Sequence, residues 1–409
     1  MKINKSQLLS FFSAFLLFLF IDPYFMWWAQ KGKVVYLLFG LLMFGLFALN
    51  LDIKYKERLF LFAYFILIVI YAPLSFGLNV NACILALLVC TIPFAKKKFA
   101  CSTYDNLLTI YSVVISLSGI VWLMTFVGAV PSLGTIEPLN ELKNHNYIVY
   151  PLLVVGNSGV FSRFYGPFDE PGVVGTISIF FLTISEFNLK DKRLLAVFIT
   201  GFFSLSFFYY GVLFAYFVFY LFFKKKKKKY AISILVFIVA AVAITYNNDI
   251  MYDYMWSRFE WDSSNGTFAG DNRLSPYALY LFDSIIGTPE FYFGINNYLY
   301  YEQDLAGSSS IILTIIQYGI IYVGLYISFF LLYGFLYKKN WSTYLFFVFV
   351  FLGTLFQRPC LMEPEYLFCF SLMATNYITQ ERFQQKTPFI RKRPILNNDS
   401  LPYVKCEYV

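Results

Sequence analysis

The chain has 409 residues, of which 59% are hydrophobic and only 14% are charged. Soluble globular domains carry about 25% charged residues, so this composition excludes an ordinary soluble domain. The net charge of +8 falls in short basic clusters between apolar blocks, which is typical of loops on the cytoplasmic side of a membrane and not of a nucleic-acid-binding surface.

The apolar blocks predict an all-α polytopic membrane protein with about twelve transmembrane helices, each of roughly 20 residues. The basic clusters place both termini on the cytoplasmic side, in a bacterial inner membrane. Residues 1–380 would form one membrane domain, and residues 381–409 a disordered cytoplasmic tail. The predicted spans are 8–29, 34–50, 59–76, 78–94, 107–130, 171–188, 194–208, 210–223, 230–246, 309–336, 341–357 and 365–380.

Residues 194–223 are the least regular part of this layout. The basic clusters on both sides of them fall on one face of the membrane only if the segment crosses twice, yet each half is shorter than an ordinary span. Ser204, Ser206 and the residues 209–211 mark the expected turn. The pattern predicts a hairpin of two helices.

A polar segment before the span at 171–188 forms the first candidate site. It holds Arg163, the adjacent carboxylates Asp169 and Glu170, and then Pro171, which suits the first position of a helix. A helix N-terminus favours an anion, and an arginine offers a planar fork that suits phosphate. We therefore expect Arg163 to bind phosphate, and Glu170 or Asp169 to act as a base on a hydroxyl. Under a simpler interpretation, a carboxylate only caps the helix and pairs with Arg163.

The outward loop 247–308 is the second candidate region. Within it, Ser275-Pro276 starts a short amphipathic helix that ends at Gly287, and its apolar stripe predicts a position on the membrane interface. Arg273, which leads into this helix, is the best second phosphate contact. A solvated loop is polar in any case, so the sequence does not single out one tyrosine. The candidate substrate-binding residues are Tyr165, Gly166, Arg258, Trp261 and Asp271.

The sequence offers little for metal or triad chemistry. His145 is the single histidine, and there is no HExxH motif or Cys/His cluster. The six cysteines contain no CxxC pair. We predict an enzyme without a metal or other cofactor, and a Ser-His-Asp hydrolase is disfavoured.

Three segments resemble the bacterial O-antigen and exopolysaccharide repeat-unit polymerases of the Wzy type, as does the layout with one large outward loop. They are Arg163-x-x-Gly166 running to Glu170-Pro171-Gly172, Ser204-Leu205-Ser206, and the run from Asp271-Asn272-Arg273 through Gly294 to Gln317-Tyr318-Gly319-Ile320.

The resemblance implies a glycosyl transfer at the periplasmic face of the inner membrane. One oligosaccharide, linked to undecaprenyl diphosphate, would be moved onto the terminal sugar of another lipid-linked repeat unit. Arg163 and Arg273 would neutralise the leaving diphosphate, and Glu170 would take the proton of the attacking hydroxyl. Membrane lipids and a chain-length regulator protein are the implied partners.

Other classes fit the sequence less well. The related O-antigen ligases carry a histidine near the end of the large loop, where this chain has Gly307-Ser308-Ser309-Ser310. A lipid-linked oligosaccharide flippase would place charges within its spans, whereas these charges lie in loops. A glycosyltransferase with an acidic pair in its first outward loop is disfavoured, because that loop is Gln30-Lys31-Gly32-Lys33.

Overall fold

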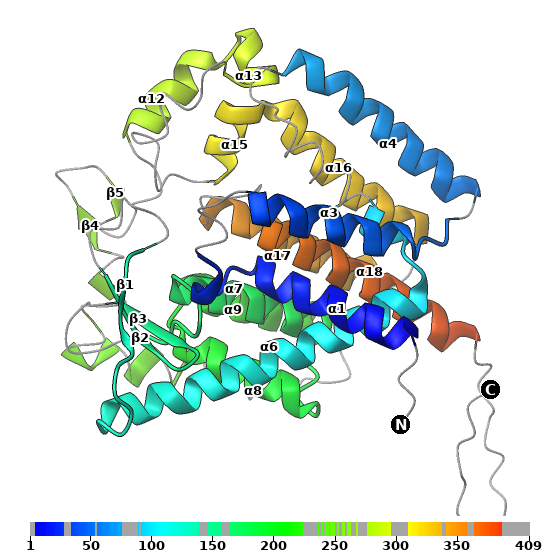
Figure 1. Ribbon diagram of the computed structural model, residues 1–409. Helices are drawn as coiled ribbons and strands as arrows, with labels where there is room; N and C mark the ends of the chain where they lie inside the picture. The colour runs from blue at the N-terminus through cyan, green and yellow to red at the C-terminus, as the bar shows by residue number, and fades with distance from the viewer. Residues whose placement is uncertain are drawn as a thin grey trace, which may run out of the picture.

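The computed structural model describes residues 5–27, 34–53, 55–75, 91–138, 146–156, 163–223, 276–295, 310–337, 341–357 and 364–386, together with residue 89 and scattered residues between 232 and 268. It is mostly helical (Figure 1). The helices are α1 (Lys5–Phe20), η1 (Tyr24–Met26), α3 (Val34–Ala48), α4 (Tyr55–Leu74), η2 (Ile92–Phe94), α6 (Lys97–Phe126), α7 (Pro171–Ile184), α8 (Lys192–Phe203), α9 (Phe207–Phe223), α12 (Pro276–Ile285), α13 (Pro289–Phe293), α15 (Ser310–Tyr318), α16 (Ile320–Tyr337), α17 (Trp341–Gln357) and α18 (Pro364–Lys386). The strands are β1 (Gly134–Ile136), β2 (Tyr147–Tyr150), β3 (Leu153–Gly156), β4 (Trp261–Asp262) and β5 (Thr267–Phe268).

Several predicted spans coincide with helices, and α17 covers the predicted range 341–357. The first predicted span is wrong at its end, because α1 stops at Phe20 and Pro23 cannot continue a helix. Helix α6 begins at Lys97, before the predicted span 107–130, and so includes polar residues such as Thr103, whose Oγ1 donates to Phe99 O.

Two further boundaries also differ from the prediction. The range 309–336 is not one straight helix, because the chain bends by 118° between α15 and α16. Gly319 lies at this bend with φ +82°, a conformation that glycine adopts without a steric penalty. Helix α18 runs past the predicted end of the last span at 380 and continues to Lys386 through good helix formers that precede Pro388; the disordered tail 381–409 stays a prediction.

Of the described helices, α6 is the one that is long and apolar enough by itself to cross a membrane. The bent pair of α15 and α16 adds a second crossing if it is counted as one span. Helices α1, α7, α9 and α17 are apolar but shorter. The layout of about twelve spans therefore stays a prediction.

Large apolar side chains lie exposed on the outer helices. Examples are Phe12 of α1 at 50%, Leu59 of α4 at 62% and Leu123 of α6 at 57% exposure. Exposed apolar surface of this kind marks a face that meets lipid or a protein partner.

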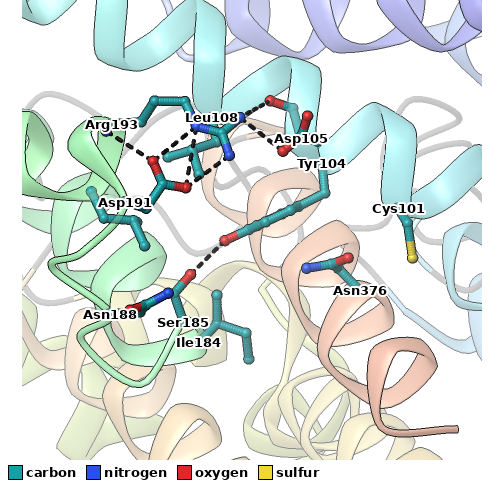
Figure 2. A pocket seen from close by; sticks show the side chains of 11 residues that line it. Cys101, Tyr104, Asp105, Leu108, Ile184, Ser185, Asn188, Asp191, Arg193 and Asn376 are labelled. Carbon is teal, nitrogen blue, oxygen red and sulfur yellow. Dashed lines mark hydrogen bonds and ion pairs between the residues drawn. The ribbon is translucent and has the colours of Figure 1, made fainter. Parts of the chain in front are cut away.

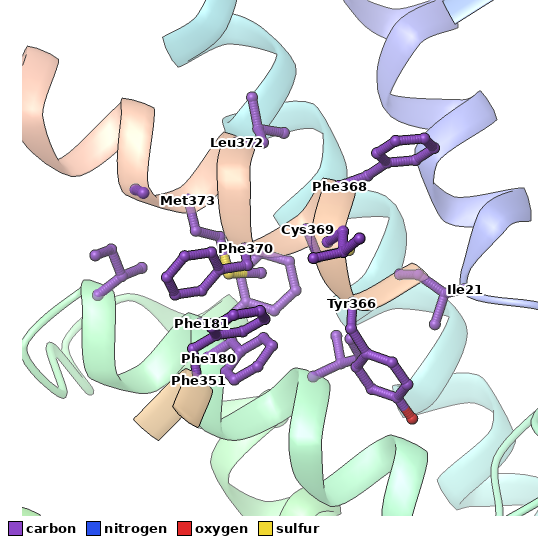
Figure 3. Packing of buried hydrophobic residues seen from close by; sticks show 14 of the residues in the cluster. Ile21, Phe180, Phe181, Phe351, Tyr366, Phe368, Cys369, Phe370, Leu372 and Met373 are labelled. Carbon is purple, nitrogen blue, oxygen red and sulfur yellow. The ribbon is translucent and has the colours of Figure 1, made fainter. Parts of the chain in front are cut away.

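Helix α7 lies at the centre of the bundle, and all of its residues are buried. Its neighbours include α8, α9, α17 and α18. Figure 3 shows Phe180 and Phe181 of α7 close to Phe351 of α17 and Phe370 of α18. The ring centroids of Phe351 and Phe370 lie 3.9 Å apart. The aromatic residues of this chain thus form the core around α7.

The segment 194–223 forms two helices, as predicted. The Tyr209 hydroxyl of α9 donates to Phe198 O of α8 at 2.8 Å, so the two helices contact each other, and both pack on α7. Small residues permit the close packing of both helices on α7, since a Cβ added at Gly175 would lie 2.6 Å from Ser206 Cβ. Whether each helix crosses the membrane stays a prediction.

The fold is not purely α-helical. In the loop 131–170 an antiparallel sheet of order β1-β2-β3 forms, with Ile148 paired to Val155. Its strands are rich in Val, Ile and Tyr, which favour a pleated, half-buried surface. Strands β4 and β5 form a second, two-stranded sheet.

Candidate functional site

Residues 163–170 cross one end of the bundle and join elements that are distant in sequence. The Phe164 amide donates to Phe203 O at the end of α8 (3.1 Å), and Gly166 O accepts from the amide of Val154 in β3 (2.9 Å). Gly166 has φ +60°, which explains the glycine at this turn. The segment is therefore tied to both the bundle and the sheet.

The second half of the segment is tied to η1 and β2. Pro167 O accepts from the amide of Tyr24, and Asp169 O accepts from the Tyr147 hydroxyl, both at 2.7 Å. The ring of Tyr165 packs on Tyr147 with centroids 6.1 Å apart. Tyr165 and Gly166 thus have structural roles here, and their predicted substrate contacts stay untested.

The Arg163 side chain is held by the turn between α8 and α9. Its Nε donates to Ser204 O at 3.2 Å, and its Nη2 donates to Leu205 O at 2.8 Å. Both carbonyls follow the last residue of α8, Phe203, so Arg163 bonds to the backbone where this helix ends. Because two of the five N–H donors of a guanidinium are used in this way, the plane of the charged group is fixed.

Glu170 occupies the N-cap position of α7 with extended backbone angles, φ −141° and ψ 141°, but its side chain makes no capping hydrogen bond. Pro171 follows at the first helical position, as predicted. Capping by the Glu170 side chain, one part of the simpler interpretation, is therefore wrong. Capping by Asp169 and the pairing of a carboxylate with Arg163 stay predictions. The Glu170 carboxylate lies half-buried at the positive end of the α7 dipole.

Buried hydroxyl groups gather where α7 meets the α8–α9 turn. Ser204 Oγ donates to Gly201 O at 2.6 Å. Thr176 Oγ1 and Ser206 Oγ are buried and lack a hydrogen-bond partner in the described part of the chain. This end of the bundle is therefore polar inside, beneath the guanidinium of Arg163.

Other predicted site residues are not brought into this cluster. Arg258, Asp271 and Arg273 lie outside the described residues, as does His145. Trp261 lies in β4, in the second sheet, and is 62% exposed. The predicted convergence of Arg163 and Arg273 stays a prediction.

A polar cavity of about 200 Å³ lies at the opposite end of α7 (Figure 2). Arg193 spans it, with Nη1 2.8 Å from Asp105 Oδ1 of α6 and Nη2 2.8 Å from Asp191 Oδ2. Asp191 also caps α8 by accepting from the Arg193 amide. The hydrogen bonds from Arg193 lower the pKa of the Asp191 carboxyl, so this network links α6 to the α7–α8 turn.

This network was not predicted from the sequence. Arg193 belongs, with Lys190 and Lys192, to one of the short basic clusters that indicate the cytoplasmic side. The available signal was Asp191 directly before Lys192, an aspartate well placed to cap a helix. Its second partner, Asp105, is far away in sequence and gave no signal.

Two of the three segments that carry the resemblance are in contact. They are Arg163 to Gly172 and Ser204-Leu205-Ser206, and the Arg163 side chain joins them. No protein-family model, curated protein or solved structure matches the chain. The function therefore has to be inferred from the geometry of the site itself.

Proposed function

We propose that the protein polymerises undecaprenyl-diphosphate-linked oligosaccharide repeat units of O-antigen or a related surface polysaccharide. The observation that carries this proposal is the contact of the Arg163 guanidinium with the α8–α9 turn, beside the N-terminus of α7 where Glu170 does not act as a capping side chain. Together they supply a fixed cation and a carboxylate at one end of a buried helix.

The reaction is a glycosyl transfer. The terminal sugar hydroxyl of one repeat unit attacks the anomeric carbon of another, and the bond between that carbon and the diphosphate oxygen breaks. Arg163 stabilises the negative charge that builds on the leaving diphosphate, with the N-terminus of α7 contributing its dipole. Glu170 accepts the proton of the attacking hydroxyl, so no charge is left on the new glycosidic bond.

The apolar side chains exposed on the outer helices support the proposed membrane location. The apolar side chains exposed on α1, α3, α4, α6 and α8 suit a lipid surround, and α6 is long enough to cross it. In the proposed arrangement, a polytopic bundle of about twelve spans sits in the inner membrane with the Arg163 end facing the periplasm. The lysine- and arginine-rich loops then face the cytoplasm.

Deletion of the gene tests the proposal. Without polymerisation, lipopolysaccharide should carry a single repeat unit, because transfer of one unit to the lipid acceptor does not need the polymerase. Complementation with the wild-type gene should restore long chains. Loss of every repeat unit would refute the proposal and point to a flippase or a ligase.

A further inference from the structure

Two glycines form a close joint where the large loop returns to the bundle. Gly294 follows α13 and Gly319 separates α15 from α16, with φ values of +88° and +82°. A Cβ at Gly294 would overlap the carbonyl of Gln317, and one at Gly319 would overlap the carbonyl of Tyr292. The two backbones therefore touch, and glycine is required at both positions.

Helix α4 holds this joint from the bundle side. The buried hydroxyl of Tyr71 donates to Tyr318 O and also lies 3.2 Å from Tyr292 O. One turn further along, Ser75 Oγ donates to Phe293 O at 2.9 Å. The Tyr71 hydroxyl thus contacts both chain segments of the joint at once.

The joint continues into the described part of the large loop. The amide of Ile295 donates to Ile316 O at 2.8 Å. Helix α12 packs on α15, where Ala278 and Ile285 contact Leu313 and Ile316 in one buried cluster. In Figure 1, α12, α13 and α15 lie together beside the end of α4. The apolar stripe of α12, from which an interfacial position was predicted, thus packs in part against α15.

We infer that Tyr71 is a positioning residue, which fixes α12 and α13 relative to the bundle through the two-glycine joint and thereby sets the sugar-binding geometry of the large loop. The last part of this inference rests on the proposed function, because it assumes that the loop takes part in binding lipid-linked repeat units. The ring of Tyr71 stacks on Tyr322 with centroids 6.0 Å apart, so Tyr71→Phe removes the hydroxyl and keeps the packing.

Tyr64→Phe is the matched control. Tyr64 is a buried tyrosine of the same helix, and its hydroxyl donates to Ser328 Oγ of α16 at 2.9 Å, away from the joint. Hydrogen exchange is measured on the purified full-length variants. In Tyr71→Phe, the amides of Ile295 and Gly319 should exchange about five- to tenfold faster than in Tyr64→Phe. Equal exchange rates in the two variants would overturn the inference that Tyr71 fixes the joint.

The role in the reaction is tested with the same two variants. With a purified lipid-linked repeat unit, Tyr71→Phe should raise KM about fivefold while kcat stays as in Tyr64→Phe, because a displaced loop weakens binding. A purely structural loss would lower the active fraction and leave KM unchanged, and that result would overturn the positioning role. Failure of the proposed function itself would appear differently: neither variant nor wild type would polymerise, while the exchange comparison would still report on the joint.

Discussion

Replacement of Arg163 tests both the structural and the chemical role of the site. Arg163→Ala removes two hydrogen bonds from a charged donor to the carbonyls of Ser204 and Leu205, at 3.2 and 2.8 Å. A hydrogen bond to a charged group contributes about 1.5–3 kcal/mol, and the half-buried guanidinium leaves room for water to replace part of that. We expect the free energy of unfolding to fall by roughly 2–4 kcal/mol.

The effect on catalysis should be separable from this loss of stability. Arg163→Lys keeps the positive charge, but an ammonium cannot bridge two carbonyls and a phosphate with a planar fork. If Arg163 stabilises the leaving diphosphate, the polymerisation rate of Arg163→Lys should fall roughly 100-fold, which corresponds to about 2.7 kcal/mol. The assays are thermal unfolding of the purified protein and the chain-length pattern of lipopolysaccharide at matched protein levels.

Arg193→Ala is the control for Arg163, since it removes a guanidinium at the opposite end of α7. This variant should retain long polysaccharide chains. Wild-type chain length in both Arg163 variants would refute the phosphate assignment. An unchanged unfolding temperature in Arg163→Ala would show that the bonds to the α8–α9 turn contribute nothing to stability.

Three further substitutions give distinct outcomes. Glu170→Gln should abolish long chains, because the amide cannot accept the proton. It should change the unfolding temperature little, because glutamine keeps the size and shape of the side chain; retention of long chains would exclude Glu170 as the base. Gly175→Val should destabilise the protein by about 1–3 kcal/mol through overpacking, since even a Cβ at this position would lie 2.6 Å from Ser206 Cβ, and a normal unfolding temperature would contradict the close packing. Asp191→Asn should lower stability at pH 7 by less than about 1 kcal/mol, because the ion pair is partly exposed. The pKa of the Asp191 carboxyl in the folded protein is lowered from the ordinary 3.8, so the stabilisation is present above pH 3.8 and lost as the pH falls further. A stability difference between Asp191→Asn and wild type that persists in stronger acid would contradict an origin in the ion pair.

Local signals in the sequence were sufficient for several elements. Pro171 begins α7, and the helix predicted from Ser275-Pro276 to Gly287 is α12, followed by Gly287 with φ +84°. In each case the deciding residues are neighbours in sequence, because proline at a helix start and glycine after its end act on their own backbone.

Features that depend on distant partners were not predictable in this way. The bend at Gly319 becomes necessary only because the backbone at Tyr292 packs against it and the Tyr71 hydroxyl bonds to Tyr318, 247 positions away in the chain. The sequence around Gly319 is apolar on both sides and therefore resembles one continuous span. Likewise, Arg193 pairs with Asp105, 88 positions away, and hydropathy alone cannot indicate such a pairing.

The two ends of α7 differ in a way that supports the proposed site. Every residue of this helix is buried, so the backbone groups at both ends must find partners within the protein. At the far end, Arg193 is paired with two carboxylates and Asp191 caps the next helix, which accounts for the charges there as structural. At the near end, Arg163 is fixed by carbonyls, while the Glu170 side chain holds the N-cap position without capping the helix. Serine and asparagine are the usual capping residues at that position, so capping of the helix does not explain why a glutamate stands there. This asymmetry between the two ends is the physical reason for placing the chemistry at the end that carries Arg163 and Glu170.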